Sequence, residues 1–223
     1  MKAVAPRLPI VCVTLSDALI PELAASYARP GGTVTGIALT VEGLTGKLVE
    51  LTAETVPGIA RIGFLLNPAG ASMRLFADSV MASARARGIA ILIQEASTRD
   101  DLPPAISRLA KQDIQALIVP ENGLFWVSRV QIVQLALAAR LPTIFAERQS
   151  VGAGGLVSYG IDIKENYRHA AVYVAKILKG ANAGELPIEF PTKVELVINL
   201  RTAKALGLEL SPQLLARADE VIE

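Results

Sequence analysis

The chain has 223 residues, of which 22 are basic and 21 acidic, and its formal net charge is +1. This balance excludes the strongly basic surface of nucleic-acid-binding domains and gives no attraction to an anionic membrane. Hydrophobic residues make up 52% of the chain, but no apolar run approaches the roughly 20 residues of a membrane-spanning helix. We therefore expect a small molecule or a protein as partner, with no nucleic acid and no direct membrane insertion.

The first run of apolar residues extends from Leu8 to Leu15 and follows a short segment with one lysine and one arginine. It has no small-residue cleavage site, so it does not match a secretory signal peptide. It is instead the first of seven runs rich in valine and isoleucine that lack clean alternation of polar and apolar residues. Such runs are typical of strands buried on both faces of a parallel sheet. The runs cover residues 8–15, 33–39, 60–66, 89–94, 116–119, 142–146 and 156–159.

Helical patterns separate these runs. Apolar residues at helical spacing predict helices over 44–55 and 76–84. Thr98 to Asp101 is a capping-box pattern, and Ser128 can cap the helix that follows it. A longer helix is predicted over 164–179; the apolar residues on one of its faces are Tyr167, Ala171, Val174 and Leu178.

The alternation of strand and helix is complete only between residues 60 and 159, where it suffices for one doubly wound lobe. The flanking segments supply only two clear strands. We therefore predict an α/β protein in which residues 59–160 form the second lobe, and residues 1–58 with 161–223 form an incomplete first lobe. Because a stable open sheet normally has about four to six strands, we also expect further coding sequence upstream of Met1, beginning with a signal peptide.

Polar residues end most of the predicted strands. In open α/β sheets, ligands bind beyond the carboxyl ends of the strands, so these positions are candidate ligand contacts. They are Ser16, Asp17, Thr35, Asn67, Glu121, Asn122, Glu147, Arg148 and Tyr159. Each has a structural alternative: Ser16 or Asp17 could cap a helix over residues 18–28, and Asn67 could form a turn. The number of polar strand ends favours a shared cleft.

Two aromatic residues, Phe125 and Trp126, follow Asn122 closely. They could belong to the core, or they could stack on a ligand ring at the rim of the cleft.

Motifs for catalysis or cofactor binding are absent. Residues 43–47 imitate part of a phosphate loop and residues 152–157 a dinucleotide fingerprint, but both lack required residues. Cys12 is the only cysteine, which excludes an intrachain disulfide and a cysteine-rich metal site. His169 is the only histidine and falls in a helix, so a hydrolase triad or a histidine metal site is not expected. We expect no enzyme activity, no metal and no cofactor.

Several segments together resemble the tryptophan/tyrosine-type substrate-binding proteins of ABC transporters. They are residues 9–11, 16–17, 28–36, 46–51, 153–160, 176–180, 191–207 and 214–222. The resemblance covers essentially the whole chain, and its last two segments are the most specific. It implies a type I periplasmic binding fold, in which two doubly wound parallel-sheet lobes, joined by hinge crossings, close on a small amino-acid-like or aromatic solute. It also implies a permease partner and a periplasmic or lipid-anchored extracytoplasmic location.

The resemblance also distributes the candidate contacts between the lobes. The expected first-lobe contacts are Ser16, Asp17 and Thr35, with Asp17 facing an ammonium group of the solute in a charge-assisted hydrogen bond. The expected second-lobe contacts are Asn67, Glu121, Asn122 and Tyr159. Phe125 or Trp126 would supply an apolar wall, as in pockets that combine apolar surface with few polar anchors.

Two alternatives come from other functional classes. A ligand-sensing transcription regulator can share this fold, but it needs a helix-turn-helix and a basic footprint. An amino-acid racemase of the paired-cysteine type needs two thiols, and this chain has only Cys12. Both alternatives are therefore disfavoured.

Overall fold

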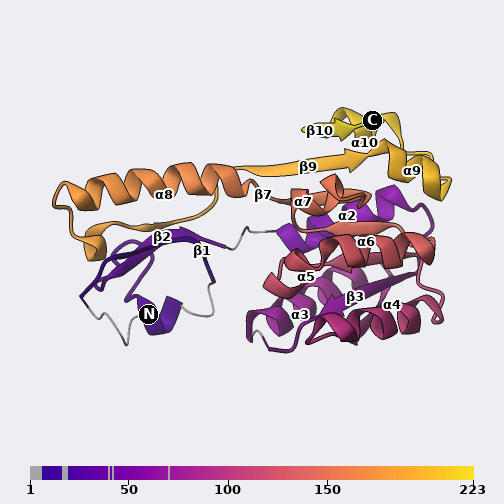
Figure 1. Cartoon of the computed structure of the whole chain (residues 1–223), viewed down its shortest axis with the longest axis horizontal. Helices are drawn as coiled ribbons and strands as arrows, with labels where there is room; N and C mark the ends of the chain where they lie inside the picture. The colour runs from indigo at the N-terminus through magenta and orange to yellow at the C-terminus, as the bar shows by residue number, and fades with distance from the viewer. Residues whose placement is uncertain (1–6, 17–19, 40, 42, 70) are drawn as a thin grey trace. The chain divides into compact units, whose positions relative to one another are not determined.

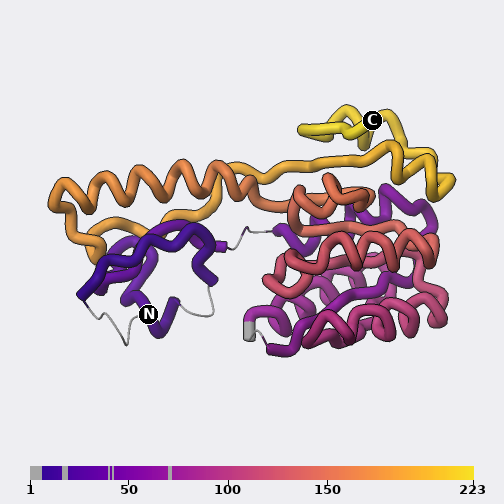
Figure 2. Tube along the Cα trace, in the orientation of Figure 1, coloured from indigo at the N-terminus to yellow at the C-terminus, as the bar shows by residue number. Residues whose placement is uncertain are grey.

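The computed structural model describes residues 7–16, 20–39, 41, 43–69 and 71–223. The chain forms two compact units. Unit 1 comprises Met1–Glu42 and Ile161–Val194, and unit 2 comprises Gly43–Gly160 and Glu195–Glu223. The chain therefore passes between the units three times, and its course can be followed in Figures 1 and 2.

The described part of unit 1 contains a parallel sheet of three strands in the order β1-β2-β8. The strands are β1 (Ile10–Leu15), β2 (Val34–Ala38) and β8 (Ile188–Glu189), and the helices are α1 (Ile20–Leu23), α8 (Ile163–Leu178) and the 3-10 turn η3 (Ala183–Glu185). Helix α8 packs on β1 and β2. The small apolar core of this unit is formed by Leu15, Ile20, Val34, Ala38 and Ile188.

Helix α8 confirms the helix predicted over 164–179 and begins at an Asp162 cap that accepts from the backbone N–H groups of Lys164 and Glu165. Its sheet-facing side carries Asn166 and Tyr173, which are buried. The apolar face identified in the sequence points the other way, because Tyr167 is 62% exposed and Leu178 is 82% exposed. The packed side of α8 makes polar bonds instead: Asn166 Nδ2 donates to the Val13 carbonyl at 3.1 Å, and the Tyr173 hydroxyl donates to the Pro187 carbonyl at 2.9 Å.

Unit 2 is built on a seven-stranded sheet in the order β10-β9-β7-β6-β5-β3-β4, and every pair with an assigned register is parallel. The strands are β3 (Arg61–Leu66), β4 (Ala90–Glu95), β5 (Ala116–Val119), β6 (Thr143–Phe145), β7 (Val157–Ile161), β9 (Val194–Asn199) and β10 (Glu220–Ile222). The helices are α2 (Leu44–Thr55), α3 (Ala71–Arg85), η2 (Arg99–Asp101), α4 (Leu102–Ala110), α5 (Gly123–Val127), α6 (Arg129–Ala138), α7 (Arg148–Gly152), α9 (Leu200–Leu206) and α10 (Pro212–Ala216).

Both faces of the unit 2 sheet are covered by apolar clusters. Successive residues of a strand point to opposite faces, so Phe64 joins the cluster that includes α2, α3, α9 and α10, while Leu65 joins the cluster that includes α4, α5 and α6. Burial on both faces explains why the strands read as continuous apolar runs.

All seven predicted strands are present, and the α/β architecture with parallel sheets is confirmed. Strands β8, β9 and β10 were not identified from the sequence, because two of them are very short and β9 runs directly into α9. The predicted lobe boundaries also differ from the structure. Helix α2 and residues 195–223, assigned to the first lobe, belong to unit 2, because Leu48, Leu196 and Leu214 share one apolar cluster with β3 and β5.

The capping predictions have different outcomes. The Thr98–Asp101 capping box is confirmed: the Asp101 carboxylate accepts the backbone N–H of Thr98 at 2.8 Å. Ser128 occupies the position before α6, but its side chain makes no capping bond. Its hydroxyl oxygen instead accepts a hydrogen bond from Arg99 Nε at 3.2 Å.

None of the described helices combines the length and the apolar character that crossing a membrane requires.

Candidate functional site

The carboxyl ends of β3, β5 and β6 lie at one edge of the unit 2 sheet, since these strands are parallel neighbours. The polar residues within three positions of these ends include Asn67 after β3, Glu121 and Asn122 after β5, and Glu147 after β6. We call these four residues the strand-end group. Polar side chains from separate segments are thus brought to the edge where open α/β sheets bind ligands.

Asn67 and Asn122 contact each other directly. The Asn67 Nδ2 group donates to Asn122 Oδ1 at 3.1 Å, and the same oxygen accepts the backbone N–H of Leu124 at 3.0 Å, which caps α5. Asn67 Oδ1 accepts the backbone N–H of Ala69 at 3.1 Å, and Asn67 is 9% exposed. These bonds fix the ends of two strands and the start of α5 against one another.

Glu121 and Glu147 are two half-buried carboxyl groups close enough to interact. Burial raises the pKa of Glu121 to about 7, and the negative charge of Glu147 adds to this effect. Burial also raises the pKa of Glu147, although bonds from Ser150 and Gln149 and the charge of Arg129 oppose the rise. A cationic group placed beside this pair would favour ionisation of Glu121.

Glu147 also begins α7. Its carboxylate accepts the backbone N–H of Ser150 at 3.1 Å and the hydroxyl of the same residue. These bonds oppose the rise in the pKa of Glu147, whereas burial and the charge of Glu147 both raise the pKa of Glu121.

The two aromatic candidates differ in exposure. Phe125 is only 2% exposed and belongs to the apolar cluster with Phe145, which agrees with the core alternative for this residue. Trp126 is 44% exposed. The guanidinium of Arg129 lies 4.8 Å from the centroid of the Trp126 ring, and Arg129 Nη1 donates to the Trp126 carbonyl at 2.8 Å.

Tyr159 lies within β7, two residues before its end, and is half-buried. It packs against the apolar cluster that contains Val157. The next residue, Gly160, is required by a close approach, because a Cβ atom there would lie 1.8 Å from the carbonyl oxygen of Ala146. This close contact brings β7 against the end of β6.

The unit 1 candidates are less favourable. Thr35 is fully buried, and its hydroxyl donates to the carbonyls of Leu186 at 2.7 Å and Pro187 at 3.2 Å. It therefore has no surface for contact with a solute here and instead ties β2 to the segment before β8. Ser16 directly follows β1 and is half-buried. Asp17 lies outside the described residues.

The structure thus brings Asn67, Glu121 and Asn122 together, with Trp126 on the adjoining helix. Of their neighbours, Glu147 was a candidate contact that was not assigned to either lobe, and Arg129 was not identified from the sequence. Glu147 follows a predicted strand, so the strand-end rule includes it. No motif indicates Arg129, because its contacts with Trp126 depend on the turn between α5 and α6.

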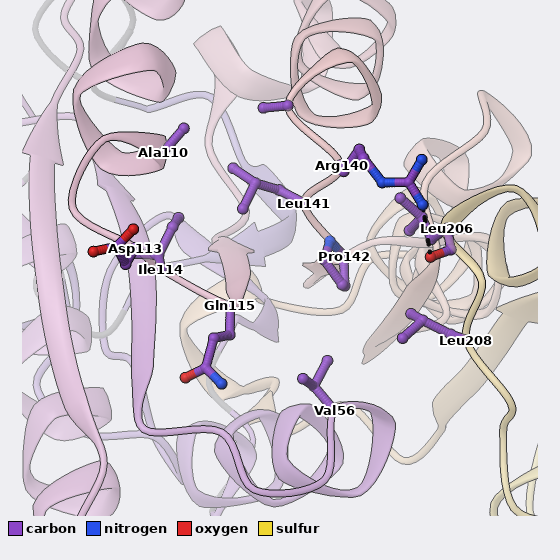
Figure 3. A pocket seen from close by; sticks show the side chains of 11 residues that line it. Val56, Ala110, Asp113, Ile114, Gln115, Arg140, Leu141, Pro142, Leu206 and Leu208 are labelled. Carbon is purple, nitrogen blue, oxygen red and sulfur yellow. Dashed lines mark hydrogen bonds between the residues drawn. The ribbon is translucent and has the colours of Figure 1, made fainter.

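A cavity of about 470 Å³ lies at the opposite edge of unit 2, and Figure 3 shows the side chains that line it. It lies near the amino ends of β5 and β6, since Gln115 and Pro142 directly precede these strands. The Arg140 side chain points toward α9 and donates to the Leu206 carbonyl at 3.5 Å. This cavity is therefore separate from the strand-end group.

Among the described residues, no cluster of three or more histidine, cysteine or acidic side chains could hold a metal ion.

Comparison with known proteins agrees with this architecture. The curated tyrosine-binding protein of Clostridioides difficile (strain R20291) is 28% identical over 204 residues, which is 91% of this chain and 58% of the relative. The chain thus spans less than two thirds of that protein's length.

Two solved structures extend the comparison. A conserved domain protein from Vibrio cholerae superposes with a TM-score of 0.89 at 26% identity, covering 98% of this chain and 73% of the other. An ABC domain in complex with L-Trp from Streptococcus pneumonia superposes with a TM-score of 0.87 at 21% identity, covering 96% and 72%, and it shows the fold alone. The family model for ABC transporter substrate binding proteins matches residues 1–222. The chain belongs to this family of ABC transporter substrate-binding proteins.

Proposed function

We propose that this chain supplies solute recognition for an ABC importer and that its solute is a small amino acid or a related aromatic compound. The observation that carries the proposal is the strand-end group, in which the Asn67–Asn122 bond lies beside the Glu121–Glu147 pair. The matched family gives the transport role. The names of two similar proteins, one tyrosine-binding and one in complex with L-Trp, support an amino acid with an aromatic side chain.

The chemistry of the strand-end group suits an ammonium group. A carboxylate that is partly removed from water gains most from a nearby cation, because charge-assisted hydrogen bonds are roughly twice as strong as neutral ones. Glu121, whose pKa is raised to about 7 by burial and by Glu147, becomes ionised when an ammonium group pairs with it. Glu121 is therefore the proposed unit 2 anchor for the amine of the solute.

The remaining contacts follow from the same scheme. The side-chain amides of Asn67 and Asn122 provide hydrogen bonds, and Trp126 provides an apolar surface. From unit 1, Ser16 and Asp17 remain proposed contacts, with Asp17 as a second anchor for a cationic group. Tyr159 remains a proposed contact through the exposed part of its ring.

The proposed partner is the membrane permease of the importer, and the proposed location is periplasmic or lipid-anchored outside the cytoplasm. Both follow from the family, whose members are extracytoplasmic substrate-binding proteins. Binding without turnover is part of the proposal. A transcription regulator is not favoured, because the matched family covers the chain from residue 1 to residue 222.

A ligand screen tests the proposal. Purified protein is screened by thermal shift against the common amino acids and aromatic amines, and positive compounds are measured by calorimetry. We expect saturable binding of at least one amino acid, and chromatography should recover that amino acid unchanged. Failure of every amino acid to bind would contradict the proposed solute class, and consumption of the compound would contradict a binding protein.

A pair of variants then tests the anchor. In Glu121→Gln the amine loses its charged partner, and the affinity should fall by roughly 2 to 5 kcal/mol, the cost of leaving a desolvated charge unpaired. Glu95→Gln is the matched control, because Glu95 also ends a strand of the same sheet but is exposed and forms an ion pair with Arg74 at 3.4 Å. The control should bind like the wild type.

A further inference from the structure

We infer that Arg129 is a positioning residue that holds the Trp126 ring from one side, so that the exposed part of the ring forms a stacking platform for the aromatic group of the solute. This inference rests on the proposed function and specifies which part of the site recognises an aromatic ring.

The backbone of Trp126 is fixed to the strand-end group. Its N–H donates to the Asn122 carbonyl at 2.8 Å, and the Asn122 side chain both caps α5 and accepts a bond from Asn67. Because α5 is a single short helix, spanning Gly123–Val127, this cap links its first turn to the ends of β3 and β5. A change at the ends of β3 and β5 is therefore transmitted directly to Trp126.

The other end of α5 is held by two arginines. Arg129 donates to the Trp126 carbonyl at 2.8 Å, and Arg99 Nη2 donates to the Val127 carbonyl at 3.3 Å. Arg99 also donates to the Ser128 hydroxyl oxygen at 3.2 Å. Basic side chains commonly satisfy the last carbonyls of a helix in this way. The junction between α5 and α6 is thus held in one geometry before any solute binds, which reduces the entropic cost of binding.

Arg129 makes a second contact with the same residue. Its guanidinium lies 4.8 Å from the Trp126 ring centroid, within the range of a cation–π interaction. With its carbonyl and its ring held by one side chain, Trp126 has little freedom to rotate. The indole nevertheless stays 44% exposed, and its neighbours Val127 and Val130 are 53% and 51% exposed. Trp126 thus presents an exposed ring on the short helix that begins at Asn122, directly after Glu121.

Arg129 also links this surface to the carboxyl groups, because its charge opposes the rise in the pKa of Glu147. A negatively charged Glu147 in turn disfavours ionisation of Glu121. The aromatic surface and the amine anchor therefore share one arginine. A solute that carries both an ammonium group and an aromatic ring matches the two neighbouring features.

Trp126 is the only tryptophan of the chain, which makes its fluorescence a direct test. Full-length protein is excited at wavelengths that tyrosine does not absorb, and emission, anisotropy and acrylamide quenching are recorded with and without L-tyrosine. We expect L-tyrosine to protect Trp126 from quenching. In Arg129→Gln without solute, anisotropy should fall and quenching should rise. Arg129→Lys, which keeps the charge, should be intermediate.

Calorimetry on the same proteins measures whether Arg129 affects the binding of an aromatic amino acid more than that of a small aliphatic one. Arg129→Gln should weaken L-tyrosine binding by roughly 2- to 30-fold, the range of a cation–π contact, and should change L-alanine binding much less. The control is Arg85→Gln on α3, an exposed arginine in the last turn of a helix, which should match the wild type. Circular dichroism verifies that each variant is folded.

The outcomes separate the inference from the proposed function. If L-tyrosine binds by calorimetry without affecting Trp126 emission or quenching, the platform is excluded while the solute-binding function stands. Equal losses for L-tyrosine and L-alanine in Arg129→Gln would show a general structural effect and overturn the positioning role. If no amino acid binds to the wild type, the proposed solute class and the platform both fail.

Discussion

Asn67 donates a hydrogen bond of 3.1 Å from its side-chain amide to the side-chain oxygen of Asn122. This bond joins the end of β3 to the end of β5, although the two residues are 55 positions apart in the sequence. Because Asn122 is also the N-cap of α5, the bond makes the helix that carries Trp126 depend on the turn after β3. The strand ends thus form one connected polar structure rather than separate loops.

The first prediction concerns this connection. Asn122→Ala removes both the cap of α5 and the acceptor for Asn67, so we expect the free energy of unfolding to fall by about 1 to 3 kcal/mol. Asn122→Asp keeps an oxygen that can accept from Leu124 and from Asn67, and it should cost less. Urea unfolding of the three proteins, followed by far-ultraviolet circular dichroism, measures the difference.

Asn182→Ala provides the control for this prediction, since Asn182 caps the short turn η3 in unit 1 through a bond to Gly184 and has no role at the strand ends. It should change stability without changing the fluorescence of Trp126, whereas Asn122→Ala should change both. Identical spectra of Trp126 in the wild type and Asn122→Ala would contradict the coupling between Asn122 and Trp126.

The second prediction is a pH dependence that originates at Glu121. Its pKa is raised to about 7 in the folded protein, chiefly by burial, while an unfolded glutamate has a pKa of about 4.3. The folded state therefore prefers the protonated acid, and the contribution of this group to stability falls as pH rises from about 4 to about 7. Glu121→Gln removes this loss, so the variant should be more stable than the wild type by roughly 1 to 3 kcal/mol above pH 7.

Denaturant unfolding at several pH values tests whether Glu121→Gln is more stable than the wild type at high pH. Below about pH 4 the wild type and Glu121→Gln should have nearly equal stabilities, because the glutamate is protonated in both states. A constant difference at all pH values would point to a packing effect instead. A solute amine should reverse the order, since it stabilises the wild type and not the variant.

The regular part of the fold was predictable because it depends on local patterns. Strands buried on both faces give apolar runs, and each of the seven runs in the sequence corresponds to one of the strands β1 to β7. The division into lobes was not predictable in the same way. Helix α2 belongs to unit 2 because Leu48 and Leu51 pack with residues of the carboxyl-terminal segment such as Leu214, a contact between distant parts of the chain.

For the candidate site, the sequence indicated which strand ends to consider, but it did not indicate which side chains there are buried or bonded. The rule that ligands bind beyond strand ends led to Asn67, Glu121 and Asn122, whose proximity the structure shows. It could not distinguish a buried side chain from an exposed one, so it grouped Phe125 with Trp126. It also could not show that the hydroxyl of Thr35 bonds to backbone carbonyls some 150 residues away.

The third prediction compares the stability of the two units. Residues of β3 and β5 are almost entirely buried, whereas five of the six residues of β1 are only partly buried. Strand β1 also lies at the edge of its sheet. Backbone hydrogen exchange should therefore be slower in residues 61–66 and 116–119 than in residues 10–15. Equal protection in the three strands would contradict a more stable unit 2.

The last prediction concerns Asp17, whose role rests on the sequence. If Asp17 is an anchor for a buried ammonium group, Asp17→Ala should weaken solute binding by roughly 2 to 5 kcal/mol, because the partner charge is left desolvated and unpaired. If Asp17 is a helix cap, the same change should cost only about 0.5 to 2 kcal/mol of stability and leave the intrinsic affinity nearly unchanged.

Calorimetry and thermal unfolding of the same Asp17→Ala preparation distinguish these two roles, and Asp17→Asn sharpens the comparison. Asparagine is about as good a helix cap as aspartate, but it carries no charge for an ammonium group. An anchor therefore predicts that Asp17→Asn binds the solute nearly as weakly as Asp17→Ala while keeping the stability of the wild type. We expect this pattern. Wild-type affinity in Asp17→Asn would assign Asp17 to capping and leave Glu121 as the proposed anchor for the amine.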